Sequence, residues 1–308
     1  MIRPQDLLCP RPEGLYCPPG DFYIDPVRPV DRAVITHGHA DHARAGHSAV
    51  LATPETLAIM AERYGADFAT TTEAAPYGRA VSRDDVEVML VPAGHVLGSA
   101  QAVVRWKGLT MVVSGDYKRR RDPTCPPFEP VACDVFISEA TFGLPVFRHP
   151  DDAEEVARLL REGGWDRAIY VHGALERLNG LYESHGIALG PLAPATGGAK
   201  ADFAGQIIVA PPSALQDRWS RRFPDPVAAF ASGWMQIRAR ARQRGVELPL
   251  VISDHADWDE LTATVAEIRP AELWITHGRE EALARWAELQ GIPARALALV
   301  GYEDESED

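Results

Sequence analysis

The feature that most constrains this chain is a run of potential metal ligands that directly follows a short apolar strand. Residues 33–36 are Ala-Val-Ile-Thr, and the next six positions contain His37, His39, Asp41 and His42, separated by one glycine and one alanine. Because the chain turns after a strand and the small residues leave room, three imidazoles and a carboxylate can face one point. Core packing does not explain this order, since such side chains are seldom buried without a partner. The segment predicts a metal site at a strand end.

Three later segments offer further ligands at the ends of expected strands. His95 lies in the glycine-containing stretch 92–100, Asp116 follows the strand 110–114, and His277 follows the strand 273–276. Each would more often be structural by itself, because a core can hold a satisfied histidine and an aspartate often makes a turn. Two metal ions about 3.5–4 Å apart, however, need roughly seven or eight ligands with one shared between them. The convergence of these strand ends favours such a site, with Asp116 as the bridging carboxylate.

Length and composition indicate a soluble globular chain, with one large domain or two that share it. The chain has 308 residues, of which 46% are hydrophobic, and shows neither a signal-peptide pattern nor an apolar run of about 18 residues. We therefore expect a cytoplasmic protein with no membrane partner. The cysteines lie eight positions apart within each neighbouring pair (Cys9 and Cys17, Cys125 and Cys133), so they do not form a C-x-x-C zinc clip, and we interpret them as free thiols.

The net charge of −13 argues at first against a polyanionic partner, because affinity for nucleic acids depends on lysine and arginine. The basic residues are nevertheless clustered in three runs, over 118–121, 218–222 and 238–244. Such runs are more often solvated helix faces, so by themselves they do not establish nucleic-acid contact. The first run begins two residues after Asp116, and we expect it to border the site and guide a nucleic-acid strand; its members are Lys118, Arg119, Arg120 and Arg121.

Hydrophobic patterns divide the chain into a core, an insertion and a tail. Strands are expected over 22–24, 33–36, 49–52, 86–91, 102–106 and 109–113, and an amphipathic helix over 54–65 with Thr53 as its N-cap. From about 150 to 249 the pattern changes to helices such as 152–161, short strands and a loop rich in glycine, proline and alanine, which we interpret as an inserted cap.

The core pattern returns from 250, with a strand at 250–252, a helix at 257–268, a strand at 273–276, a helix at 280–289 and a strand at 296–300. The class is therefore α/β or α+β. We expect a core of residues 1–149 and 250–300, a cap of residues 150–249 and a disordered acidic tail of residues 301–308.

These motifs resemble those of the metallo-β-lactamase superfamily, in which an early aspartate and H-x-H-x-D-H are followed by a histidine, an aspartate and a histidine. Asp25, after the strand 22–24, matches the first position better than Asp31 does. The resemblance implies an αββα sandwich in which Asp25 orients a ligand without binding metal. It also implies the ligand sets: one ion on His37, His39 and His95, the other on Asp41, His42 and His277, with Asp116 shared. Five imidazoles and two carboxylates suit two Zn²⁺ ions, and Mn²⁺ is the alternative.

Two further segments resemble motifs of the β-CASP nucleases, a branch that inserts a cap between them. Residues 138–143 are similar to the acidic motif and residues 253–258 to the histidine motif. The resemblance implies that His255 is the general acid that protonates the leaving oxygen and that Glu139 orients it. In phosphodiester hydrolysis, two metal ions would activate a water as the hydroxide nucleophile and stabilise the added charge.

Over nearly its whole length the chain is similar to bacterial DNA exonucleases encoded beside an ATP-dependent DNA ligase. The similarity depends on residues 115–123, 142–147 and 232–235, and one departure is Ala174, where relatives tend to have lysine. It implies a DNA exonuclease in DNA repair, with DNA favoured over RNA and with the ligase and a helicase as partners. An RNA-processing nuclease is the main alternative, since a histidine such as His277 is commoner in RNA-acting members.

Two other functions remain open and explain less of the sequence. A small-molecule hydrolase of the same fold would account for the metal ligands but leaves the cap, Glu139 and His255 without a purpose. A non-catalytic scaffold would be expected to have lost ligands, and here the set is complete.

Overall fold

The computed structural model describes residues 2–149, 165–215, 217–297 and 299, and the chain divides into two compact units. The first unit comprises Met1–Arg148 and Asp254–Asp308, and the second comprises His149–Ser253. The helix expected over 152–161 and the tail 301–308 lie outside the described residues. Among the helices that are described, none combines the length and the apolar character that crossing a membrane would require.

The first unit begins with a short helix, α1 (Pro4–Leu7), and a mixed six-stranded sheet. In spatial order its strands are β1 (Cys9–Arg11), β2 (Gly14–Cys17), β3 (Phe22–Ile24), β4 (Arg32–Val34), β5 (His47–Ala52) and β6 (Ala69–Ala74). Strands β1 to β3 pair antiparallel, and β3 to β6 pair parallel. Strand β4 lies between β3 and β5, which run parallel to it, and the ligand run follows the end of β4.

A seven-stranded sheet forms the other half of the first unit. Its strands in spatial order are β18 (Ala294–Ala296), β17 (Glu272–Gly278), β11 (Val135–Ala140), β10 (Leu109–Val113), β9 (Ala100–Trp106), β8 (Val86–Pro92) and β7 (Ala80–Arg83). Strands β7 to β10 are antiparallel, whereas β10, β11, β17 and β18 run parallel. Strands β11 and β17 are neighbours although the whole second unit lies between them in the sequence.

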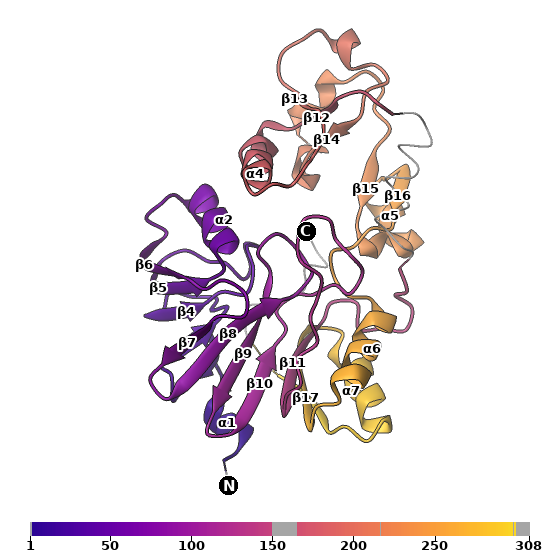
Figure 1. Cartoon of the computed structure of the whole chain (residues 1–308). Coiled ribbons are helices and arrows are strands. Elements are labelled where there is room, and N and C mark those ends of the chain that lie inside the picture. Colours follow the sequence, from indigo (N-terminus) through magenta and orange to yellow (C-terminus); the bar gives the residue numbers. More distant parts are fainter. Residues whose placement is uncertain (1, 150–164, 216, 298, 300–308) are drawn as a thin grey trace. The chain divides into compact units, whose positions relative to one another are not determined.

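Three hydrophobic layers separate four layers of secondary structure. Val34, Val104 and Trp274 are buried between the two sheets. Helix α2 (Pro54–Tyr64) packs on the outer face of the first sheet, and helices α6 (Trp258–Ile268) and α7 (Glu280–Leu289) cover the outer face of the second. Alternate residues of β9 face the two sides, as Val104 points between the sheets and Val103 toward the helices. The first unit is therefore the expected αββα sandwich (Figure 1).

Local sequence fixes where the two site-flanking helices begin. The hydroxyl of Thr53 accepts a hydrogen bond from the Thr56 N–H at 3.2 Å, and Pro54 occupies the first helical position of α2. Asp257 caps α6 in the same way, accepting from the Glu260 N–H at 3.0 Å. These caps set where the chain leaves the loops that carry the ligands.

The second unit has its own small sheets and core. A parallel sheet has the order β13 (Leu192–Pro194), β12 (Ile169–Val171), β14 (Ile208–Val209), with α4 (Gly173–Ser184) following β12. The other elements are β15 (Ala229–Ala231), β16 (Leu248–Leu250), α5 (Arg238–Gln243) and the short helices η1 (Lys200–Phe203), η2 (Pro212–Leu215), η3 (Arg218–Arg222) and η4 (Gly233–Gln236). The strand expected at 250–252 corresponds to β16, which pairs with β15 in this unit, so the first unit resumes only at Asp254.

Candidate metal centre

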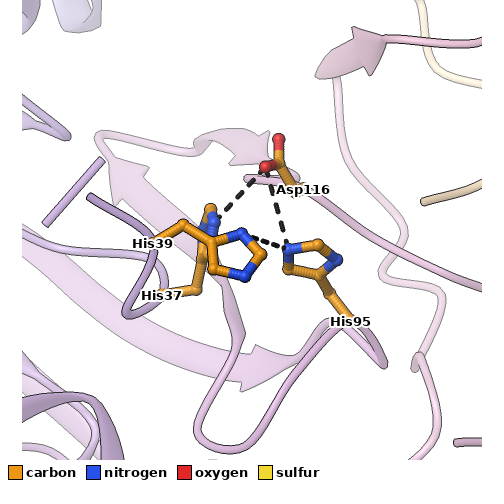
Figure 2. A group of neighbouring side chains, drawn as sticks. All are labelled: His37, His39, His95 and Asp116. Carbon is orange, nitrogen blue, oxygen red and sulfur yellow. Dashed lines mark hydrogen bonds and ion pairs between the residues drawn. The ribbon is translucent and has the colours of Figure 1, made fainter. Parts of the chain in front are cut away.

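The carboxylate of Asp116 lies among four imidazole rings from separate parts of the first unit. Its Oδ2 is 3.3 Å from Nε2 of His37, 3.3 Å from Nε2 of His42 and 3.8 Å from Nε2 of His95. Its Oδ1 is 3.0 Å from Nε2 of His277. Figure 2 shows how this carboxylate and the rings of His37, His39 and His95 face one another. One buried acid thus organises rings that follow β4, precede β9 and end β17.

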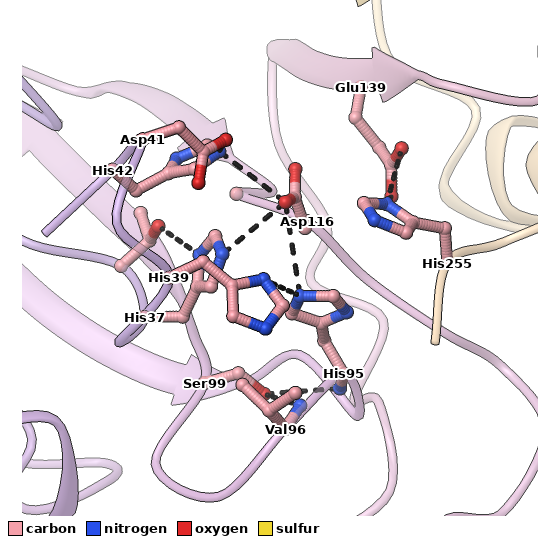
Figure 3. A network of polar contacts seen from close by, with 12 residues as sticks. His37, His39, Asp41, His42, His95, Val96, Ser99, Asp116, Glu139 and His255 are labelled. Atoms are coloured by element: carbon pink, nitrogen blue, oxygen red, sulfur yellow. Dashed lines mark hydrogen bonds and ion pairs between the residues drawn. The ribbon is translucent and has the colours of Figure 1, made fainter. Parts of the chain in front are cut away.

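The seven predicted ligands form two clusters that share Asp116. The first cluster is His37, His39, His95 and Asp116, whose potential ligand atoms all lie within 4.8 Å of one another. The second cluster is His42, His277 and Asp116 under the same limit, with the Asp41 carboxylate 3.3 Å from Nε2 of His42. Figure 3 shows Asp41, His42 and Asp116 on one side of the network and His39 and His95 on the other. Six of the seven residues group as the sequence predicts, and Asp41 joins them through its contact with His42. The ligand sets and metal binding itself stay predictions.

The loop after β4 presents its histidines through close packing against α2. Ile35 still pairs with Leu51 of β5, its N–H donating to the carbonyl oxygen at 2.9 Å, and the following residues then leave the sheet. The chain turns at His39, whose carbonyl oxygen accepts from the Ala43 N–H at 2.7 Å. Gly38 is required because a Cβ there would lie 2.7 Å from Cγ2 of Ile59 in α2. The packing against α2 therefore explains why residue 38 is a glycine.

A β-bulge aims His277 at the site. Strands β11 and β17 pair in regular register up to Glu139 and Thr276, but the next partners are Ala140 and Gly278, so His277 is the extra residue. Its φ of 31° lies in the left-handed region, where only a bulge or turn places a histidine. Its Nδ1 is 2.5 Å from the hydroxyl oxygen of Thr276, which leaves Nε2 directed at Asp116. The bulge therefore supplies one ligand of the second cluster.

Asp25 orients His42 from beneath the ligand loop. It is buried, and its Oδ2 is 2.9 Å from Nδ1 of His42, while its Oδ1 accepts from the Thr36 N–H at 2.8 Å. A carboxylate only accepts, so a proton of the His42 ring is held on Nδ1, and Nε2 is the atom directed at Asp116. This contact has the geometry of the ligand-orienting role predicted for Asp25.

The same reasoning assigns the proton of His37. The Thr36 hydroxyl donates its one hydrogen to Asp25, so it must accept from Nδ1 of His37, which lies 3.0 Å away. The Nε2 of His37 is then a bare nitrogen, and it is fully buried with no hydrogen-bond partner among the described residues. Such an atom is costly unless a cation takes its lone pair. The buried nitrogen and the donor set of imidazoles and carboxylates fit two divalent cations, whose identity the residues do not specify.

The two clusters differ in their electrostatics. Burial would lower the pKa of His42, but Asp116, and then Asp25 and Asp41, raise that pKa well above its usual value, so this ring must release a proton when it binds a cation. Burial, followed by the neighbouring His42, lowers the pKa of His37 well below its usual value and keeps the ring neutral, the form that binds metal. Burial would raise the pKa of Asp116, but the surrounding histidines, His42 first, hold that pKa well below its usual value. The bridging position is therefore occupied by an ionised carboxylate.

A second acid and histidine pair lies beside the first cluster. Both oxygens of Glu139, in β11, face Nδ1 of His255, at 3.1 and 3.2 Å, and they also accept from the N–H groups of Tyr117 at 3.0 Å and Thr141 at 3.2 Å. The ring of His255 lies 4.8 Å from that of His95 (Figure 3). Burial opposes protonation, but Glu139 and then Asp116 raise the pKa of His255 well above its usual value. The pair therefore has the arrangement of a general acid held by a carboxylate.

The basic run after Asp116 is mostly engaged within the first unit. Lys118 is buried, with its Nζ 3.8 Å from the Asp122 carboxylate. Arg119 contacts Glu267 at 2.7 Å and Arg120 contacts Glu260 at 3.1 Å, both on α6. Arg121 is exposed. These ion pairs weigh against the strand-guiding role predicted for the run as a whole and leave Arg121 as its exposed member.

Two residues that hold ligands were not singled out from the sequence. The Thr276 hydroxyl contacts His277, and the carbonyl oxygen of Asp254 accepts from Nδ1 of His95 at 2.7 Å. Asp254 lies inside the motif 253–258, which is the only signal that could have pointed to it. A backbone carbonyl carries no sequence signature.

Comparison with known proteins identifies a matching family. Residues 25–173 match the family described as the metallo-beta-lactamase superfamily, and the αββα sandwich of the first unit agrees with that match. A protein named "Probable DNA ligase" from Opitutus terrae is 26% identical over 314 residues, which cover 92% of this chain and 30% of that protein. The family predicted from the motifs is thus confirmed.

Other relatives align over shorter stretches. "Endoribonuclease YSH1" of Gibberella zeae is 30% identical over 42% of this chain and 15% of its own length. "Cleavage and polyadenylation specificity factor 73" of Drosophila melanogaster is 32% identical over 23% of this chain and 12% of its own length. This chain therefore spans less than a third of the length of these relatives. A solved structure of a protein of unknown function from Enterococcus faecalis V583 aligns with 79% of this chain and 74% of that chain at 16% identity, with a TM-score of 0.47.

Proposed function

We propose that this chain is a metal-dependent phosphodiesterase that acts on nucleic acid, and that its reaction is exonucleolytic cleavage of DNA in DNA repair. The observation that carries the proposal is the Glu139 and His255 pair beside two ligand clusters that share Asp116. Hydrolysis of an ester needs help at both ends of the reaction, on the attacking water and on the departing oxygen. The clusters and the pair suit these two tasks.

Two divalent ions, when bound, would supply the Lewis acidity that activates a water molecule and offsets charge on the phosphoryl oxygens. Asp116 keeps the rings of both clusters aimed at one point. Glu139 accepts the Nδ1 proton of His255, so the proton on its Nε2 is the one available for the leaving oxygen. The Tyr117 and Thr141 N–H groups hold Glu139 itself in place, so that His255 has one orientation.

The extent of similarity favours DNA as the substrate. The relative named a DNA ligase aligns with 92% of this chain, whereas the endoribonuclease of Gibberella zeae aligns with 42%. We therefore infer that an ATP-dependent DNA ligase, and with it a helicase, are partners, and that the second unit is a β-CASP-like cap. An RNA-processing ribonuclease is the second candidate, because several relatives are named as endoribonucleases.

The test is cleavage of matched DNA and RNA oligonucleotides, labelled at either end, with Zn²⁺ or Mn²⁺. We expect stepwise shortening of linear DNA, no cut in circular DNA, and loss of activity in both Asp116→Ala and His255→Ala. Cleavage of RNA alone would move the protein to RNA processing, and cutting of circular DNA would make it an endonuclease. If neither polymer is cleaved while both metals are bound, the nuclease proposal fails and a small-molecule ester becomes the substrate to test.

A further inference from the structure

The Asp254 carboxylate lies beside the first cluster. Its Oδ2 is 3.9 Å from Nε2 of His39 and 3.9 Å from Nδ1 of His95, and its Oδ1 is 3.8 Å from Nε2 of His255. The side chain is 45% exposed, whereas those of Asp25 and Asp116 are 5% and 2% exposed. Asp254 is also the first residue of the first unit after the chain returns from the second. It is therefore an accessible acid in contact range of three histidines of the site.

Among these histidines, His39 is the one that depends on the Asp254 side chain. The outer nitrogen of His95 already donates to the backbone carbonyl of Asp254 at 2.7 Å, and His255 is held through Nδ1 by Glu139. His39 turns the other way, with its Nδ1 in the cluster and its Nε2 toward Asp254. At 3.9 Å the carboxylate is too far to accept a hydrogen bond from Nε2, but its negative charge favours the tautomer of His39 that has its proton on Nε2 and a bare Nδ1.

The consequence is an unusual contact within the first cluster. Nδ1 of His39 lies 3.1 Å from Nε2 of His95 (Figure 2). The Asp254 carbonyl oxygen assigns the ring proton of His95 to Nδ1. When the His39 proton is on the Nε2 that faces the carboxylate, two lone pairs face each other across this distance. Lone pairs in this arrangement repel unless a cation lies within reach of both. The Asp254 carboxylate thus favours the ring state that a cation needs and disfavours the alternative in which one histidine simply donates to the other.

We propose that Asp254 is a positioning residue for the first metal ion, acting through His39. Its carboxylate favours one orientation and one tautomer of the His39 ring through its charge, and its backbone carbonyl fixes His95 through a hydrogen bond. The inference rests on the proposed metal centre but not on the identity of the substrate. It differs from the role of Asp25, which acts on His42 and hence on the second cluster.

The experiment measures binding of each metal ion, by competition with a chromophoric chelator and by metal analysis, in Asp254→Ala, Asp254→Asn and the wild type. Both variants retain the backbone carbonyl that holds His95, so they isolate the carboxylate. Loss of a group that orients a ligand typically weakens metal binding about 10–100-fold. We expect that loss for one ion in Asp254→Ala, a smaller loss in Asp254→Asn, which retains an acceptor oxygen, and no change for the other ion. Asp85→Ala, an exposed acid of the first unit between β7 and β8, is the matched control and should bind as the wild type does.

A double-mutant cycle identifies the ring through which Asp254 acts. In a His39→Gln background the Asp254→Ala change should add little, because its target ring is absent, whereas in a His277→Gln background it should retain its full effect. The melting temperature of the metal-free protein should not change, which separates positioning from a structural role.

Three outcomes would overturn the inference: equal weakening of both ions, additive effects in the two backgrounds, or a metal-free protein that melts lower in proportion to the loss of affinity. A wild type that binds fewer than two ions would overturn it together with the metal centre. A wild type that binds two ions, shows the expected cycle and cleaves no nucleic acid would leave the inference standing and refute only the proposed nuclease. If Asp254→Ala does not fold, Asp254→Asn carries the same comparison.

Discussion

Replacing Asp25 by asparagine should selectively weaken binding of the second metal ion. The Asp25 carboxylate accepts from the Thr36 N–H, the Thr36 hydroxyl and Nδ1 of His42. An asparagine has one acceptor oxygen and one NH₂ group, so the NH₂ would face the Thr36 N–H in one orientation, and both the Thr36 hydroxyl and Nδ1 of His42 in the other. Either Thr36 loses its acceptor, or the His42 ring loses the contact that keeps its Nε2 directed into the second cluster.

The size of the effect follows from the contacts that are lost. A hydrogen bond to a charged group contributes about 1.5–3 kcal/mol, and a buried donor left without an acceptor costs about 1–3 kcal/mol. A loss of 10–100-fold in metal affinity corresponds to about 1.4–2.8 kcal/mol, which is the same range. For a domain of this size each kcal/mol lowers the melting temperature by about 2–4 °C. Both readouts are large enough to measure.

The assay is chelator competition for each ion, together with thermal unfolding with and without metal. Asp31→Asn is the matched control, because Asp31 is the neighbouring candidate for the same motif position. Asp31 is exposed, and its carboxylate accepts a long hydrogen bond of 3.4 Å from the Ser48 hydroxyl. This substitution should shift stability by no more than about 0.5 kcal/mol. The reasoning is refuted if Asp25→Asn weakens both ions equally, weakens neither, or behaves as Asp31→Asn does.

Three further predictions test other parts of the site. Glu139→Gln should retain both metal ions and lower the cleavage rate by about 10²–10⁴-fold, since His255 loses the carboxylate that holds it; metal analysis beside a rate measurement checks this. Gly278→Ala should unfold the first unit or destabilise it by more than about 4 kcal/mol in a denaturant titration, because φ is 94° and its Cβ would overlap the Ala140 carbonyl. Arg120→Ala should lower stability without changing the salt dependence of DNA binding, whereas Arg121→Ala should reduce that dependence by about one charge.

Elements with a regular apolar pattern were the ones that could be predicted most closely. The expected bounds of β3, β10 and α7 agree with the structure, and β9 is only two residues longer than expected. Each has an apolar residue at every position that faces a hydrophobic layer, and each is bounded by turn-forming or polar residues. Burial in this fold produces the pattern that identifies the strand.

The elements that escaped prediction have physical reasons for doing so. β6 (Ala69–Ala74) is an edge strand with nearly every residue exposed, so it has no apolar alternation. β11 (Val135–Ala140) is buried at every position, but it contains Ser138 and Glu139, which interrupt the apolar run. A polar residue buried for its chemistry conceals the strand that carries it.

The structure brings the seven predicted ligands together, whereas the residues around them were harder to predict. Seven ligands come together because each follows or ends a strand at one edge of the sandwich. The basic run 118–121 was expected at the substrate, but Arg119 and Arg120 pair with α6, since a sequence does not show which acids of a distant helix lie nearby. Asp254 was missed for the same reason, because its target His39 is more than two hundred positions away.

The β11 and β17 pairing shows how closely fold and site depend on one another. Glu139 and Thr276 form the last regular pair of the two strands. The bulge that follows inserts His277 between Thr276 and Gly278. Without the bulge, the regular alternation along β17 would not direct His277 at Asp116. The same pair of strands therefore fixes the distance between the proposed general-acid pair and the second cluster. A change in this register would move the Glu139 and His255 pair away from the second cluster. The bulge must therefore be preserved if the pair and the cluster are to act on the same phosphodiester.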